Sequence, residues 1–218
     1  MWLTARVLEQ RRFAHLFLDG PPEAVATALG AYRNPDHGFG HALVPDLRGP
    51  LSQPLHTVAA LRILDETGRC HGRQAERVCR YLTSVSTPEG ALPAVHPGRH
   101  GHPTAPFLPP PSTASDLLAT GPAAGLLHRN RVWDAWLFRA TDYCWAVIEQ
   151  LNRTHPRQAL AALAFLDNAP DRARAEQAAD RLGALVRDQR LVVTDPERAH
   201  SFAPPPGYGP EERYFVCD

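Results

Sequence analysis

The sequence contains no lysine, so all 23 of its basic residues are arginines. This absence excludes mechanisms that need an amine side chain, such as Schiff-base catalysis and phosphate binding by a P-loop. The arginines are balanced by 23 acidic residues, which gives a formal net charge of zero. A chain without net charge has no overall field that attracts nucleic acid or an anionic membrane, so we expect neither as a partner.

Cysteine is scarce, and long apolar runs are absent. Cys70, Cys79, Cys144 and Cys217 form no Cys-x-x-Cys pair, so we expect neither a zinc site nor a structural disulfide. No stretch approaches the roughly 20 apolar residues of a membrane span. Charges begin at Arg6, where a signal peptide would have its apolar core. We therefore expect a cytoplasmic protein with no metal site and no transmembrane segment.

Apolar residues recur at helical spacing along most of the chain, which predicts an all-α fold. Three segments are apolar almost all the way round, and each follows a Ser or Thr cap and an early proline: 55–66, 122–129 and 156–167. Four others carry one apolar stripe against an Arg and Glu face: 22–33, 72–85, 132–151 and 171–188. This alternation predicts an inner and an outer layer of helices in a single domain, residues 1–218, with a further helix in 4–18.

Two segments are too rich in proline for regular structure, the loop 87–120 and the tail 195–218. A short strand is expected after Leu191. The tail carries Tyr208, Tyr214 and Phe215 as anchors that would dock it across one end of the helices, unless it is disordered.

A turn rich in glycine precedes the first apolar helix and reads Pro35-Asp36-His37-Gly38-Phe39-Gly40. Asp36 is expected to bond to its own turn, and Phe39 either joins two helices or contacts a ligand. This turn and the polar run and helix after it resemble the repeat of squalene and oxidosqualene cyclases and of protein prenyltransferase β subunits. The whole chain also resembles a group of small actinobacterial proteins labelled prenyltransferase-like.

The resemblance implies an α/α toroid-like barrel, incomplete or open here because only about four helical hairpins are present. It also implies an isoprenoid-handling protein of secondary metabolism, similar to a terpene cyclase or prenyltransferase. The Asp-x-Asp-Asp acid motif of the cyclases is absent, since Ser-Asp-Leu-Leu offers only Asp116, and the zinc ligands of the prenyltransferases are absent too. Whether the protein is an enzyme stays open, and a non-catalytic binding or scaffold protein that keeps the fold is the alternative.

The inner helices of such a barrel run in one direction, so their N-termini meet at one end, where free N–H groups favour anions. We expect a diphosphate or carboxylate head at this end and an apolar or isoprenoid tail among the inner helices. The predicted substrate-binding residues are Phe39, Arg48, Gln53, Thr120, His155 and Gln158. No cofactor is expected, except Mg²⁺ alongside a bound diphosphate. A second copy or a partner chain would close the open side.

Asp46 and His56 are the predicted acid–base pair, because a position at the helix ends shifts pKa values. A structural contact of Asp46 with Arg48 or Arg62 is the plainer interpretation. A third hypothesis is a carbohydrate enzyme with two facing carboxylates. The sequence offers Asp46 with Glu89 or Asp116 for that role.

Overall fold

The computed structural model describes residues 4–97, 102–106, 108–193 and 215–216. Within them the regular secondary structure consists of eight helices and two strands of two residues each, which confirms the all-α prediction. The helices are α1 (Val7–Phe17), α2 (Pro22–Gly30), α3 (Pro54–Glu66), α4 (Gly72–Val85), α5 (Leu117–Arg129), α6 (Ala135–Gln150), α7 (Pro156–Leu166) and α8 (Arg172–Asp188). The strands β1 (Val192–Val193) and β2 (Phe215–Val216) pair in parallel.

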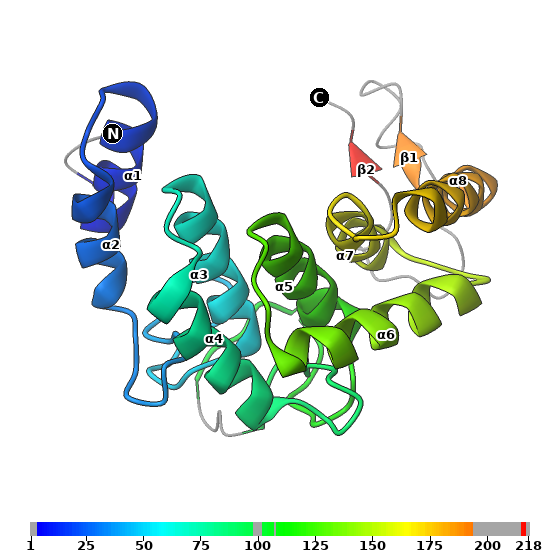
Figure 1. The fold of residues 1–218 in the computed structure, drawn as a ribbon, viewed down its shortest axis with the longest axis horizontal. Coiled ribbons are helices and arrows are strands. Elements are labelled where there is room, and N and C mark those ends of the chain that lie inside the picture. Colours follow the sequence, from blue (N-terminus) through cyan, green and yellow to red (C-terminus); the bar gives the residue numbers. More distant parts are fainter. Residues whose placement is uncertain (1–3, 98–101, 107, 194–214, 217–218) are drawn as a thin grey trace.

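Consecutive helices pair as hairpins, and the hairpins follow one another along an arc (Figure 1). Helix α5 packs between α3 and α7, and α4 contacts α6, so the inner and outer layers predicted from the apolar pattern are both present. The hairpin α1–α2 lies at one end of the arc and α7–α8 at the other (Figure 1). The arc that the described helices form is therefore open, and the toroid arrangement remains a prediction.

Helices α5 and α7 run parallel and approach each other through two glycines. A Cβ at Gly121 would lie 2.4 Å from the carbonyl oxygen of Ala161, and a Cβ at Gly125 would lie 2.0 Å from that of Ala164. Residue numbers increase together along both contacts, so the N-termini of the two helices point the same way. Most of α5 is buried by this contact and by α3 and α6, which makes it the centre of the core.

The three predicted helix caps all differ from those in the structure, and the helix predicted from 132 begins only at Ala135, as α6, because Asp134 caps it. Helix α5 begins at Leu117 because the Asp116 carboxylate caps it, accepting the Leu118 N–H at 2.7 Å. Pro122 therefore lies inside the helix, Thr120 is not a cap, and the proline-rich loop ends at 116 rather than 120. At α3 and α7 the cap positions are Gln53 and His155, each one residue later than the predicted Ser52 and Thr154.

The strand expected after Leu191 is β1, and Phe215 lies in β2. The other predicted tail anchors, Tyr208 and Tyr214, lie outside the described residues. Among the residues that the structure does describe, no helix combines the length and the apolar character that crossing a membrane requires.

Candidate functional site

The N-terminal ends of α3 and α5 meet at the segment 91–96, which covers them. Gln53 at the start of α3 holds His96 through two hydrogen bonds, because its Oε1 accepts the His96 N–H at 2.8 Å and its Nε2 donates to the His96 carbonyl at 3.4 Å. Thr120 in α5 accepts the Leu92 N–H at 2.8 Å. Ala91, Leu92, Ala94 and Val95 are all buried there. The common end that the sequence predicted is present, but between α3 and α5 it is filled by the chain itself.

These bonds give Gln53 and Thr120 a structural role. Each side chain pairs backbone groups of the covering segment 91–96, which fixes that segment over the helix starts. A ligand at either residue would have to break these bonds first. Their assignment as substrate-binding residues therefore stays a prediction that the geometry does not favour.

His56 and Asp46, the predicted acid–base pair, occupy very different surroundings. His56 in α3 is only 1% exposed, and its Nδ1 accepts the Val44 N–H at 3.0 Å. This bond places the proton of the neutral imidazole on Nε2. Asp46 is exposed on the loop 41–51, where its backbone carbonyl accepts the Ala105 N–H at 2.8 Å. An exposed carboxylate and a buried imidazole that supports a backbone turn make a poor acid–base pair.

Phe39 lies in the core and fixes the turn before α3. Its ring is fully buried, its N–H donates to Thr57 Oγ1 at 3.3 Å, and its carbonyl accepts the Gln53 N–H at 2.9 Å. Asp36 caps this turn as expected, accepting the Gly38 N–H at 2.9 Å. A Cβ at Gly40 would lie 2.2 Å from the carbonyl oxygen of Pro50, so the turn also needs a glycine there. The turn is a structural joint between α2 and α3.

Arg48 lines a different hollow from the other predicted residues. This hollow of about 470 Å³ lies between α1 and the loop 41–48. Arg6, directly before α1, lines it too and holds the loop, because it donates to the carbonyls of Ala42 and Leu43 at 3.1 Å each.

The N-terminal ends of α5 and α7 enclose a second cavity of about 160 Å³, which we name the α5–α7 cavity. Its lining residues are Leu108, Pro109, Asp116, Leu118, His155, Arg157 and Gln158. The structure thus brings the predicted His155 and Gln158 together at an inner-helix end. Within this pair, His155 Nδ1 accepts the Gln158 N–H at 3.4 Å.

Sequence reasoning missed Asp116 and Arg157 as members of this cavity. The signal of Asp116 is an aspartate before an apolar run, a common cap, but the Thr120 and Pro122 start signals that follow it compete with this cap in the sequence. Arg157 carried no signal beyond its place next to Pro156 in the first turn of α7.

The two helix ends at the α5–α7 cavity carry side chains of opposite charge, Asp116 at α5 and Arg157 at α7. Burial raises the pKa of Asp116, although its hydrogen bond from the Leu118 N–H and the charge of His155 act in the opposite direction. The start of α5 is therefore already occupied by a carboxylate. The first turn of α7 holds Arg157 and no acidic residue, so its positive dipole end favours an anion beside the His155 cap.

Asp116→Asn is expected to gain stability relative to the wild type as the pH rises. Because the pKa of Asp116 is raised by folding, its stabilising contribution is present at low pH and is lost as pH rises through the folded-state pKa. Asparagine keeps the capping acceptor and never ionises. Urea denaturation at a series of pH values measures the difference in the free energy of unfolding.

Asp171→Asn is the matched control, because Asp171 caps α8 at an exposed site by accepting the Arg174 N–H at 3.0 Å. It reports what losing an exposed capping charge does by itself. A difference between Asp116→Asn and wild type that stays flat with pH would contradict the expectation.

The buried cysteines are poor candidates for nucleophilic chemistry. Burial raises the pKa of Cys70 and of Cys79 to about 12 and raises that of Cys144 as well, so their thiols stay protonated at neutral pH. Within the described ranges, no group of three or more His, Cys, Asp or Glu side chains is placed to hold a metal ion.

Comparison with known proteins gave no relative. The chain matches no protein-family model, no curated protein and no solved structure. Its function therefore has to be argued from the geometry of the site alone.

Proposed function

We propose that the protein binds an amphipathic anion of the isoprenoid diphosphate class, with the head group in the α5–α7 cavity. The observation that carries this proposal is the make-up of the cavity. It combines the N-terminus of α7, which holds no acidic residue in its first turn, the guanidinium of Arg157 and the apolar side chain of Leu118. Diphosphates are held in proteins by such helix ends and by arginine.

The size of the cavity limits it to the head group. A drug-sized ligand needs about 300–1,000 Å³, whereas this cavity has about 160 Å³. The tail would lie outside it, along α7. Leu160 and Leu163 follow Arg157 at intervals of three residues and are 55% and 37% exposed, so they extend the same helix face away from the head group.

Asp116 is the residue with which such a site would do acid chemistry. A carboxyl whose pKa is raised by burial keeps its proton to higher pH and is suited to donate it. In its ionised form it would repel a diphosphate unless a cation lies between them, and Mg²⁺ is the ion that bridges carboxylate and phosphate oxygens.

The alternative, a non-catalytic binding or scaffold protein, is favoured by a separate observation. Gln53, Thr120 and His56, which were expected at the ligand, are all engaged in hydrogen bonds to the backbone. Under this alternative the cavity binds a ligand without converting it. Turnover separates the two candidates, because the first predicts a product and the second does not.

Calorimetric titration with farnesyl diphosphate, with and without Mg²⁺, tests the binding. We expect saturable binding that Arg157→Gln weakens by about ten- to a hundredfold, since a charge-assisted hydrogen bond contributes about 1.5–3 kcal/mol. Inorganic pyrophosphate and farnesol, titrated separately, report on the head and the tail. Arg73→Gln is the matched control, because Arg73 is also the second residue of a helix, α4, and does not line the cavity.

Absence of binding by geranyl, farnesyl and geranylgeranyl diphosphate alike would overturn the proposal. If the wild type releases diphosphate or forms a hydrocarbon, Asp116→Asn should abolish that reaction while leaving the binding measured without Mg²⁺ intact. Binding without any product would instead support the non-catalytic alternative.

A further inference from the structure

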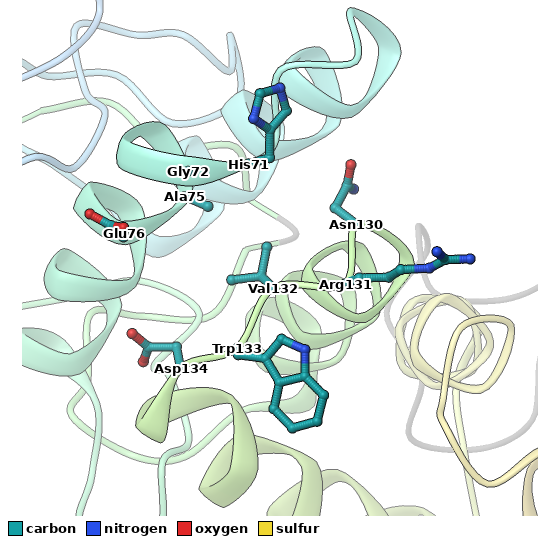
Figure 2. Close-up of a pocket in the computed structure, with 9 residues that line it drawn as sticks. All are labelled: His71, Gly72, Ala75, Glu76, Asn130, Arg131, Val132, Trp133 and Asp134. Carbon is teal, nitrogen blue, oxygen red and sulfur yellow. The ribbon is translucent and has the colours of Figure 1, made fainter.

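A third hollow lies at the opposite end of α5 from the α5–α7 cavity, between the starts of α4 and α6 (Figure 2). It has about 180 Å³, less than the roughly 300–1,000 Å³ that a drug-sized ligand needs. The side chains around it are more informative than the hollow itself. We name the surface formed by Glu76, Arg131, Trp133, Asp134 and Phe138 the Trp133 face.

The centre of the Trp133 face is aromatic and open to water. The Trp133 side chain is 83% exposed and that of Phe138 is 57% exposed, with ring centroids 5.9 Å apart. Trp136, one turn further along the chain, is fully buried. Adjacent exposed rings of this size are typical of a protein–protein interface, where tryptophan is among the residues that contribute most binding energy.

Opposite charges flank these rings. Figure 2 shows the carboxylates of Glu76 and Asp134 on one side of Trp133, and the side chain of Arg131 extending away on the other side. Glu76 and Arg131 are both exposed, and within the described ranges neither forms an ion pair. Because the two charges point away from each other, they do not pair within one chain.

This arrangement is complementary to itself. In a two-fold symmetric interface, residue i of one copy contacts residue j of the other, and j contacts i. A two-fold axis that lies in the interface beside Trp133 places each side of one copy against the opposite side of the other. Arg131 of each copy then faces the carboxylates of Glu76 and Asp134 of the other copy, and the two indoles meet at the centre. An unrelated protein partner would not require this self-complementarity.

We propose that the protein forms a two-fold symmetric homodimer through the Trp133 face. Trp133 and Phe138 of both copies form its apolar centre, and Arg131 pairs with the carboxylates at its rim. An aromatic side chain buries about 150–250 Å², so four partly exposed rings supply roughly 600 Å² of the about 1,200–2,000 Å² of a specific interface. We therefore expect a dimer that forms at micromolar concentration.

Sedimentation velocity from low to high micromolar concentration tests the proposal. We expect a reversible equilibrium between monomer and dimer in the wild type. Trp133→Ala removes one ring from each copy and should raise the Kd of the dimer at least about tenfold. Phe17→Ala is the matched control, because it removes a ring that is 69% exposed on α1, outside the Trp133 face. Circular dichroism checks that both variants keep their helices.

Exchange of the flanking charges tests the two-fold arrangement itself. Arg131→Glu and Glu76→Arg each place like charges against each other, so each should weaken the dimer at least about tenfold. Mixed in equal amounts, the two variants should associate again, because opposite charges then face each other on both sides. Arg190→Glu is the matched control, since Arg190 is exposed at φ +53° after α8 as Arg131 is at φ +54° after α5.

Three results would overturn the proposal. The first is a wild type that stays monomeric at high micromolar concentration, which would leave the Trp133 face to a different protein or to no partner. The second is a dimer that survives Trp133→Ala and both charge reversals, because it would form through another surface. The third is a mixture of the two folded charge-reversal variants that stays monomeric, because the charges would then not face each other across a two-fold axis.

Discussion

Gly125→Ala is expected to destabilise the protein by about 3 kcal/mol, near the upper end of ordinary overpacking. The new Cβ would lie 2.0 Å from the carbonyl oxygen of Ala164, an overlap that only a separation of α5 from α7 relieves. In an open helix the same change would stabilise by about 0.5–1 kcal/mol, because alanine is the better helix former. The close contact therefore reverses the sign of the effect.

Gly183→Ala in α8 is the matched control for this prediction. Its nearest neighbour would be the tip of the Arg187 side chain at 3.4 Å, which can move aside. Guanidinium denaturation should show Gly183→Ala at or above the stability of the wild type and Gly125→Ala well below it. Equal stability of the two variants would mean that α5 and α7 do not touch as described.

Phe39→Ala is expected to cost about 3–5 kcal/mol, the range for removing a fully buried phenylalanine. The ring is 0% exposed and is joined by the guanidinium of Arg33, whose carbon lies 5.1 Å from the ring centroid. If Phe39 were instead a ligand contact, its removal would weaken binding and leave the free energy of unfolding nearly unchanged. Urea denaturation without ligand distinguishes the two interpretations.

Two further variants serve as controls for this measurement. Phe39→Leu keeps most of the buried volume and should cost less than about 1.5 kcal/mol if it packs as a volume-conserving change. Phe17→Ala removes a ring that is 69% exposed on α1, so its effect should stay within about 0.5 kcal/mol. A loss of stability in Phe39→Ala no larger than that in Phe17→Ala would contradict a core role for Phe39.

The helices could be predicted well because their signals are local. The range 72–85 was predicted for α4 and is observed as Gly72–Val85. A single apolar stripe against charged residues runs through this whole segment and identifies it as a helix. The start of α5 was missed because the proline rule placed it at Pro122, while the Asp116 cap acts six residues earlier. Proline inside a helix loses one hydrogen bond, and the packing of α5 against α3 and α7 offsets that loss.

The candidate site could be predicted only in part. The sequence identified His155 and Gln158 because they follow a strong helix start. It did not show that Gln53 and Thr120 pair with the backbone of His96 and Leu92, since those partners lie 43 and 28 residues away along the chain. Hydrogen bonds over such separations depend on where the loop 87–116 passes, and its composition does not determine that path.

By itself the sequence determined the helical fold, the alternation of buried and amphipathic helices and the turn around Phe39, because periodicity and turn chemistry act over a few residues. Only the tertiary structure decided which helix ends stay open and which are filled. That outcome depends on long-range packing, in which the segment 91–96 covers the starts of α3 and α5 and leaves a cavity between α5 and α7.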